Sequence, residues 1–275
     1  MGWGRELVPD HDVEHAYVES VYHQRRSSHH YNDRSYNHHP MIIRNQLSSV
    51  HRGVAFEKLS LEILQSQLSM SLQKVGGSSD GGIDLQGWWW LPPSKRRLAP
   101  NPLPTTWTGI DGIERRRIRV LGQCKAEKKR MGPNYVRELE GVLGRHNSQP
   151  GRDPAVGLLI SQSAFTRSTV LRAFSSHIPL FLLHLPPSVQ ELDHGGEDDE
   201  DEDEGEAPDL IGSAVWNPAL GSEQGLLGGE LAVRWEWSIY TGGGRPGLWY
   251  KGEKLSSCVP SSNVLDEDAK KTRDP

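Results

Sequence analysis

The sequence predicts an α/β fold in which helices flank both faces of a mixed β-sheet. Between residues 51 and 185, apolar and amphipathic segments follow the order α-β-β-β-α-β-α-β. The first two strands are separated only by a glycine-rich loop, which favours an antiparallel hairpin. The closing β-α-β steps favour parallel strands joined by right-handed crossovers. Both strand directions are therefore expected in one sheet.

Composition indicates that this domain is only part of the chain. Hydrophobic residues make up 35% of the 275 residues and mean hydropathy is −0.61, which are low values for a chain that is packed throughout. The tryptophans near the C-terminus suggest a packed extension, because such side chains are seldom left in solvent. We expect a disordered polar tail rich in His and Asn (1–50), the α/β domain (51–185), an acidic linker (186–210), a small β-rich extension docked on the core (211–258) and a disordered tail (259–275).

The first helix is predicted over residues 53–70, where Phe56, Leu59 and Ile63 share an apolar face. Glu57 lies beside that face. A buried carboxylate there costs free energy unless it is paired or binds a metal. The alternative is an exposed Glu in the first helical turn, favoured by the helix dipole.

The remaining elements follow from alternation, apolar runs and turn residues. Gln123 and Lys125 fall on one face of the third strand, because successive side chains of a strand alternate. A stretch rich in Pro and Arg, residues 91–116, is expected to form a surface loop. The expected strands cover residues 71–75, 83–88, 118–126, 154–161 and 178–185, and the later helices cover 133–143 and 166–175.

A carboxylate on one strand and a Gln-x-Lys on its neighbour form the layout of a metal-dependent nuclease site. Phosphodiester hydrolysis needs an activated water and neutralisation of charge at phosphorus, and hard divalent cations held by oxygen ligands supply both. We expect Asp84 to bind the metal and Gln123 to add a neutral oxygen. Lys125 would orient or deprotonate the water, or stabilise charge on the phosphate.

Further groups complete the expected site. The backbone carbonyl of Cys124 would add a ligand, and Glu57 would complete the outer coordination through water. Asp80 is either another ligand or a turn residue of the glycine loop. A single Asp on a strand, or a Gln-x-Lys, occurs by chance in many proteins, so the prediction depends on the ordered set.

This ordered set resembles the Mrr-type branch of the PD-(D/E)xK restriction-endonuclease-like superfamily. Many members of the superfamily carry an acid where Gln123 stands, and Mrr-type enzymes also use Gln there. The residues that carry the resemblance are Glu57, the block Gly76–Asp84, Gln123-Cys124-Lys125 and the turn Ser161–Thr166.

More narrowly, three segments resemble the fungal "required for respiratory growth" mitochondrial family over roughly residues 50 to 185. The resemblance implies a restriction-endonuclease-like fold, Mg²⁺ or Mn²⁺ as cofactor, a mitochondrial location and a link to respiratory growth. The three segments are Leu68–Leu72 leading into Gly76-Gly77, Asp84–Trp90 and Gln123–Lys125.

Charge favours a polyanionic partner such as DNA. Net charge is −5, yet residues 51–185 hold 19 Lys and Arg against 10 Asp and Glu, and residues 191–206 hold 11 acids with no Lys or Arg. Phosphate contacts are expected from basic residues around the third strand. They are Arg115, Arg116, Arg117, Arg119, Lys128, Lys129 and Arg130. The alternative is an ordinary solvated basic face.

Three functions fit these patterns. The first is a metal-dependent endonuclease acting in mitochondrial DNA maintenance, the second is a catalytically inactive nucleic-acid-binding protein with the same fold, and the third is an assembly protein. The joint presence of the site residues favours the first. Cys124 and Cys258 form no disulfide framework, which suits a reduced compartment. We expect no membrane span, and an oligomer is possible.

Overall fold

The structure, a computed structural model, describes residues 49–75, 82–93, 106–187, 212–238 and 243–260. The predicted tails, the acidic linker and most of the glycine loop, with Asp80, lie outside these ranges. All described residues belong to the unit Asn45–Pro275. Within them, no helix combines the length and apolarity that crossing a membrane requires.

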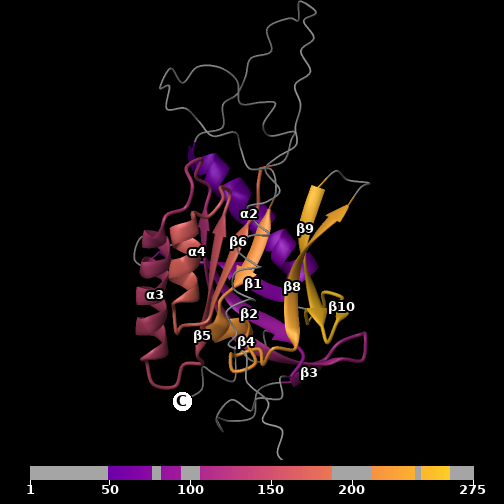
Figure 1. The fold of residues 1–275 in the computed structure, drawn as a ribbon. Coiled ribbons are helices and arrows are strands. Elements are labelled where there is room, and N and C mark those ends of the chain that lie inside the picture. The colour runs from indigo at the N-terminus through magenta and orange to yellow at the C-terminus, as the bar shows by residue number, and fades with distance from the viewer. Residues whose placement is uncertain (1–48, 76–81, 94–105, 188–211, 239–242, 261–275) are drawn as a thin grey trace, which may run out of the picture. The chain divides into compact units, whose positions relative to one another are not determined.

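A seven-stranded mixed sheet lies at the centre of the fold (Figure 1). Its order is β1-β2-β4-β5-β6-β7, and β3 also pairs with β4. Pairs β1–β2, β2–β4 and β6–β7 are antiparallel, whereas β4–β5 and β5–β6 are parallel. The mixed sheet is thus confirmed. The strands are β1 (Met70–Lys74), β2 (Leu85–Leu91), β3 (Thr106–Thr108), β4 (Glu114–Lys125), β5 (Ala155–Ser161), β6 (Leu180–His184) and β7 (Ser213–Trp216).

Helices cover both faces of this sheet, as predicted. On one face α3 (Pro133–Asn147) and α4 (Arg167–Phe174) stand together, at the left of Figure 1. The other face carries α2 (Ser49–Leu68). Each face has its own apolar core, one including Val136 and Leu139 of α3 and the other including Leu64 of α2.

A second, three-stranded sheet packs on the α2 side. Its order is β10-β9-β8, and its buried leucines belong to the same core as α2. Trp235 packs against this core, but Trp237 is exposed. The expectation that the C-terminal tryptophans are packed is therefore confirmed only in part. The elements are α6 (Pro218–Gly221), β8 (Leu231–Ser238), β9 (Gly243–Tyr250) and β10 (Glu253–Leu255).

The apolar face of α2 differs from the prediction. Phe56, Leu64 and Leu68 are buried, whereas Leu59 is exposed. Ser60 completes the buried row at four-residue spacing, and its hydroxyl donates to the carbonyl of Phe56 at 2.7 Å. A serine whose hydroxyl bonds to a carbonyl of its own helix can be buried among apolar residues. Because Ser60 is polar, the buried row could not be recognised from apolar residues alone.

Local signals place the starts of α3 and α4. Pro133 stands in the first turn of α3, where its missing N–H leaves no helical hydrogen bond unmade. Thr166 caps α4 by accepting the N–H of Thr169 at 3.3 Å, as predicted. The end of α3 was placed too early, because the helix continues past Leu143 to Asn147.

The predicted loop over residues 91–116 is confirmed only in part where the structure describes it, because strands occupy several of these residues. β2 continues to Leu91, β3 lies within the stretch and β4 already begins at Glu114. Trp107 of β3 meets Trp90 of β2 edge-on, with 6.1 Å between ring centroids. A run of arginines shows no apolar period, so the first part of β4 could not be recognised as a strand.

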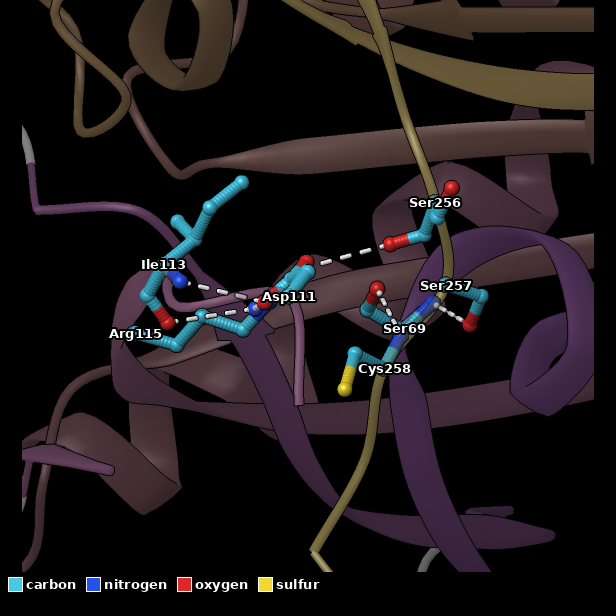
Figure 2. Close-up of polar contacts among 7 residues, drawn as sticks. All are labelled: Ser69, Asp111, Ile113, Arg115, Ser256, Ser257 and Cys258. Atoms are coloured by element: carbon cyan, nitrogen blue, oxygen red, sulfur yellow. Dashed lines mark hydrogen bonds and ion pairs between the residues drawn. The ribbon is translucent and has the colours of Figure 1, made fainter. Parts of the chain in front are cut away.

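Arg115 and Arg116 are buried, so the prediction that they contact DNA is wrong. The guanidinium nitrogens of Arg115 donate to the two carboxylate oxygens of Asp111 at 2.8 and 2.6 Å (Figure 2). Arg115 also donates to the carbonyls of Ile113 and Ser256, at 3.2 and 3.3 Å. Arg116 donates to a backbone carbonyl that follows α6.

The C-terminal extension is tied to the large sheet at both of its ends. β7 pairs with β6, and the next residue, Asn217, is buried. Its side-chain oxygen accepts two backbone N–H groups, and its Nδ2 donates to three carbonyls, one in the last turn of α4 and two between α4 and β6. Further on, Ser257 and Cys258 exchange hydrogen bonds with Ser69 at the α2–β1 junction (Figure 2).

Candidate active site

Asp84 lies where the antiparallel pairing of β2 ends and β4 continues beyond it. Its N–H donates to the carbonyl of Gly122 at 2.9 Å, and its Oδ2 accepts the N–H of Cys124 at 2.7 Å. Asp84 therefore satisfies a donor of β4 that has no strand partner on this edge. The N–H and carbonyl of one strand residue point to the same edge, so the carbonyl of Cys124 also faces Asp84.

The thiol of Cys124 is unsuited to be a metal ligand. Burial raises its pKa, and the neighbouring charges of Asp84 and Glu57 raise that pKa further. A thiol binds metal as the thiolate, which this environment disfavours. Only the backbone carbonyl of Cys124 remains available as the sequence analysis expected.

Glu57 is paired with Lys74, a residue that the sequence analysis did not single out. The Lys74 ammonium, on β1, lies 2.5 Å from Oε2 of Glu57, whose side chain is 19% exposed. The pKa of Lys74 is raised by its hydrogen bond to Glu57 and then by the charge of that group, with smaller contributions that include Asp84. Alternation along β1 would have found Lys74, because it shares a face with Met70 and Leu72.

Gln123 faces α3 and is 5% exposed, and its Oε1 has no hydrogen-bond partner in the described part of the chain. A Cβ at Gly82 would lie 3.1 Å from Nε2 of Gln123, and Gly82 has φ +84°. Glycine is needed there for both space and backbone conformation. A pocket of about 570 Å³ adjoins the two residues and follows α3 from Arg137 to Arg145.

Lys125 lies beyond Gln123 on β4, where it contacts an aromatic ring. Its ammonium is 5.6 Å from the ring centroid of Tyr135 in α3. The Tyr135 hydroxyl donates to the carboxylate of Glu127 at 2.7 and 2.8 Å, and this bond is the main cause that raises the pKa of Tyr135 to about 12. Lys125 is thus positioned by a neutral ring.

The structure divides the predicted site between two faces of the sheet. Glu57 belongs to α2, Gln123 faces α3 and Asp84 contacts the backbone of β4 at Cys124. Among the described residues, no three His, Cys, Asp or Glu side chains are grouped so that they could hold a metal. A cation at this edge would depend on the Asp84 carboxylate, the Gln123 amide and the Cys124 carbonyl.

The basic residues expected to contact DNA lie in two separate places. Lys128 and Lys129 are exposed in the turn between β4 and α3, and Arg130 beside them is partly buried. The Lys129 carbonyl accepts the Ser163 hydroxyl at 2.6 Å, which ties this turn to the start of the α4 segment. Arg119 lies on the sheet instead.

Arg119 donates to Oε1 of Gln86 at 2.9 Å and lies over Trp88. The guanidinium carbons of Arg117 and Arg119 are 4.2 and 5.1 Å from the Trp88 ring centroid. No local pattern in the sequence gives Trp88 a role in the predicted site. Its position opposite Arg119 follows from the β2–β4 register, which the sequence alone does not fix.

Comparison with known proteins gives a family but no solved structure. The profile of a family described as "Required for respiratory growth protein 7" matches residues 48–206. An uncharacterised mitochondrial protein of Schizosaccharomyces pombe is 29% identical over 138 residues, covering 50% of this chain and 46% of that protein. No solved structure matches the chain with comparable significance.

The relatives named "Required for respiratory growth protein 7, mitochondrial" include those of Vanderwaltozyma polyspora and Eremothecium gossypii. The protein of Vanderwaltozyma polyspora is 26% identical over 160 residues, covering 50% of this chain and 64% of the relative. That of Eremothecium gossypii is 31% identical over 157 residues, covering 50% and 65%. The chain thus spans less than two thirds of these relatives. Their names agree with the mitochondrial location that the resemblance implied.

Proposed function

Because the chain belongs to the Required for respiratory growth protein 7 family, we propose that it serves respiratory growth in mitochondria as a metal-dependent DNA endonuclease of the PD-(D/E)xK type. The location and the growth requirement come from the names of its relatives. Endonuclease activity and a role in mitochondrial DNA maintenance rest on the candidate active site.

The observation that carries the nuclease proposal is the buried Oε1 of Gln123, which has no hydrogen-bond partner among the described residues. A buried acceptor without a donor or cation lowers the stability of the folded protein, and a bound ligand would remove this cost. Together with the Asp84 carboxylate and the Cys124 carbonyl it offers the oxygen donors that Mg²⁺ and Mn²⁺ prefer. Once bound, such an ion would lower the pKa of a water and neutralise phosphate charge.

The chain's own residues have distinct parts in this scheme. Asp84 and Gln123 would hold the cation from the two sides of Cys124. Lys125 would donate hydrogen bonds to a phosphate oxygen as negative charge develops there, or orient the attacking water. Glu57 would act through water, and its present partner Lys74 would have to give way.

The test is cleavage of plasmid and junction DNA with Mg²⁺ or Mn²⁺. Lys125→Met should lose about 100-fold or more of the rate, whereas Lys58→Met, which changes an exposed lysine of α2, should keep it. Isothermal titration with Mn²⁺ should show weaker binding for Gln123→Leu. The proposal fails if the wild type neither cleaves DNA nor binds Mn²⁺.

A second candidate function is a non-catalytic nucleic-acid-binding protein. It is favoured by the Glu57–Lys74 ion pair and by the lack of a third acid near Asp84 in the described ranges. This function predicts DNA binding that is unchanged by EDTA and by Lys125→Met. Absence of both binding and cleavage would leave the assembly function.

A further inference from the structure

One face of the sheet carries an aromatic ring between two arginines, outside the candidate active site. Trp88 of β2 stands directly opposite Arg119 of β4, and Arg117 is its diagonal neighbour. Both guanidinium groups lie over the Trp88 ring, at 4.2 Å for Arg117 and 5.1 Å for Arg119. All three side chains remain partly exposed.

This face differs from the covered part of the same sheet. The core under α3 and α4 is formed by residues such as Leu121 and Leu159, and it includes no residue of β2. Arg119 contacts a neutral amide, that of Gln86, and the ring of Trp88. Neither of these contacts carries a negative charge, so neither neutralises the Arg119 guanidinium.

Further positive charge surrounds the Trp88 face. Burial is the main cause that lowers the pKa of Arg119; the charge of Asp153 opposes it, and the charges of Arg152 and Arg117 lower the pKa further. Holding three guanidinium groups near one another is unfavourable in an isolated protein. A polyanion bound across them would remove that repulsion.

The Trp88 face leads toward the candidate active site. Arg119 and Gln123 lie on the same face of β4, four residues apart, a distance of about 13 Å along the strand. The pocket beside Gln123 continues along α3 to the exposed Arg145. A chain of phosphates could extend from one place to the other.

We propose that Trp88, Arg117 and Arg119 form a binding platform for single-stranded nucleic acid. Aromatic rings interleaved with arginines suit a single strand, because unpaired bases stack on aromatic or guanidinium planes while arginines contact phosphates. A duplex hides its base faces and would use the arginines alone. The platform rests on the proposed nucleic-acid partner of this protein, but it does not require cleavage.

The test is fluorescence anisotropy of labelled oligo(dT) and of a blunt duplex of equal length, both in EDTA. Trp88→Ala should weaken oligo(dT) binding by about fivefold or more, the range for losing one stacking contact. Arg117→Gln and Arg119→Gln should each reduce the slope of log K against log salt by about 0.7. Trp88→Phe, which keeps an aromatic ring, should bind oligo(dT) nearly as well as the wild type. If Trp88→Ala is as stable as the wild type but binds more weakly, its loss of affinity is not a folding defect.

The small sheet offers a matched control. Arg234 lies 4.2 Å from the ring of Trp249, but Trp249 also donates to the carboxylate of Glu236 at 3.0 Å. Because this acid disfavours a polyanion, Trp249→Ala should leave oligo(dT) binding unchanged. The platform is refuted if the Trp88 and Trp249 variants bind alike, or if Trp88→Ala weakens only the duplex. If the wild type does not cleave DNA but binds oligo(dT) in a way that depends on Trp88, the nuclease proposal is refuted and the platform is supported.

Discussion

Replacing Arg115 with alanine tests whether the start of β4 is a buried junction. The side chain is 0% exposed and joins the turn at Asp111 to the carbonyl of Ser256 in the C-terminal segment (Figure 2). The substitution removes a donor from the Asp111 carboxylate and from the carbonyls of Ile113 and Ser256, although the N–H groups of Ile113 and Gly109 still reach Asp111 and Ile113 respectively. It also leaves a cavity at a fully buried position.

The magnitude follows from how much of the pair is buried. Removing one partner of a buried charge pair costs about 3–5 kcal/mol, because the other charge is left unpaired. The Asp111 side chain is 26% exposed, so water can partly replace the guanidinium. We therefore expect a loss near the lower end, about 3 kcal/mol. That is a large share of the stability of roughly 5–15 kcal/mol typical of folded proteins.

Urea unfolding followed by circular dichroism measures this loss. Arg145→Ala, which changes an exposed arginine of α3, should stay within about 0.5 kcal/mol of the wild type. An Arg115→Ala protein as stable as the Arg145 variant would refute the buried junction. If it also bound DNA more weakly, the original expectation of a phosphate contact would return.

The same pair predicts a pH dependence. Hydrogen bonds from Arg115 hold the pKa of Asp111 below its usual value. A carboxyl group with a depressed folded pKa contributes stability above its unfolded pKa of about 3.9, and this contribution is lost as pH falls through the folded pKa. The difference in unfolding free energy between wild type and Asp111→Asn should therefore shrink below about pH 4. A difference that is constant across that window would contradict the pairing.

Three further substitutions test the candidate site and the extension. Lys74→Ala should strengthen Mn²⁺ binding by at most about fivefold in a calorimetric titration, since it frees Glu57 from an ion pair whose ammonium is exposed to solvent; weaker binding would count against the proposed cation position. Gly82→Ala should lower stability by about 1–3 kcal/mol because of its positive φ, whereas Gly141→Ala, in open space within α3, should be neutral or stabilising in thermal melts. Asn217→Asp should cost about 3 kcal/mol or more in urea, because a carboxylate would face three carbonyls; unchanged stability would exclude that hydrogen-bond network.

The sequence predicts the elements whose signals are local. Alternation along β4 placed Gln123 and Lys125 on one face, and they lie toward the pocket and toward Tyr135 of α3. Pro133 in the first turn of α3 and the capping residue Thr166 of α4 located the starts of the two later helices. The glycine-rich stretch indicated the hairpin, and the two strands are antiparallel, as expected. Their pairing runs from Met70 opposite Trp89 to Lys74 opposite Leu85.

What the sequence did not predict depends on partners that are distant along the chain. In the sequence Arg115 resembles a solvated charge. The structure buries it through hydrogen bonds to Asp111 and to the carbonyl of Ser256 in the C-terminal segment. Alternation places Lys74 on the same face of β1 as Met70 and Leu72, but its ion-pair partner Glu57 lies on another element, α2. Trp88 became a candidate binding residue only when the register of β2 on β4 was known.

Asp84 is the residue whose chemical and structural roles are hardest to separate, and the choice of substitution decides what is learned. Its Oδ2 accepts the Cys124 N–H at 2.7 Å, so Asp84→Ala removes a metal ligand and also leaves a strand donor unpaired. Lost cleavage in that variant would fit either cause. Asp84→Asn keeps an oxygen for the N–H but removes the charge. If it preserves stability and abolishes Mn²⁺ binding, the carboxylate serves the cation; if it changes neither, Asp84 only completes the edge of β4, and the non-catalytic function gains support.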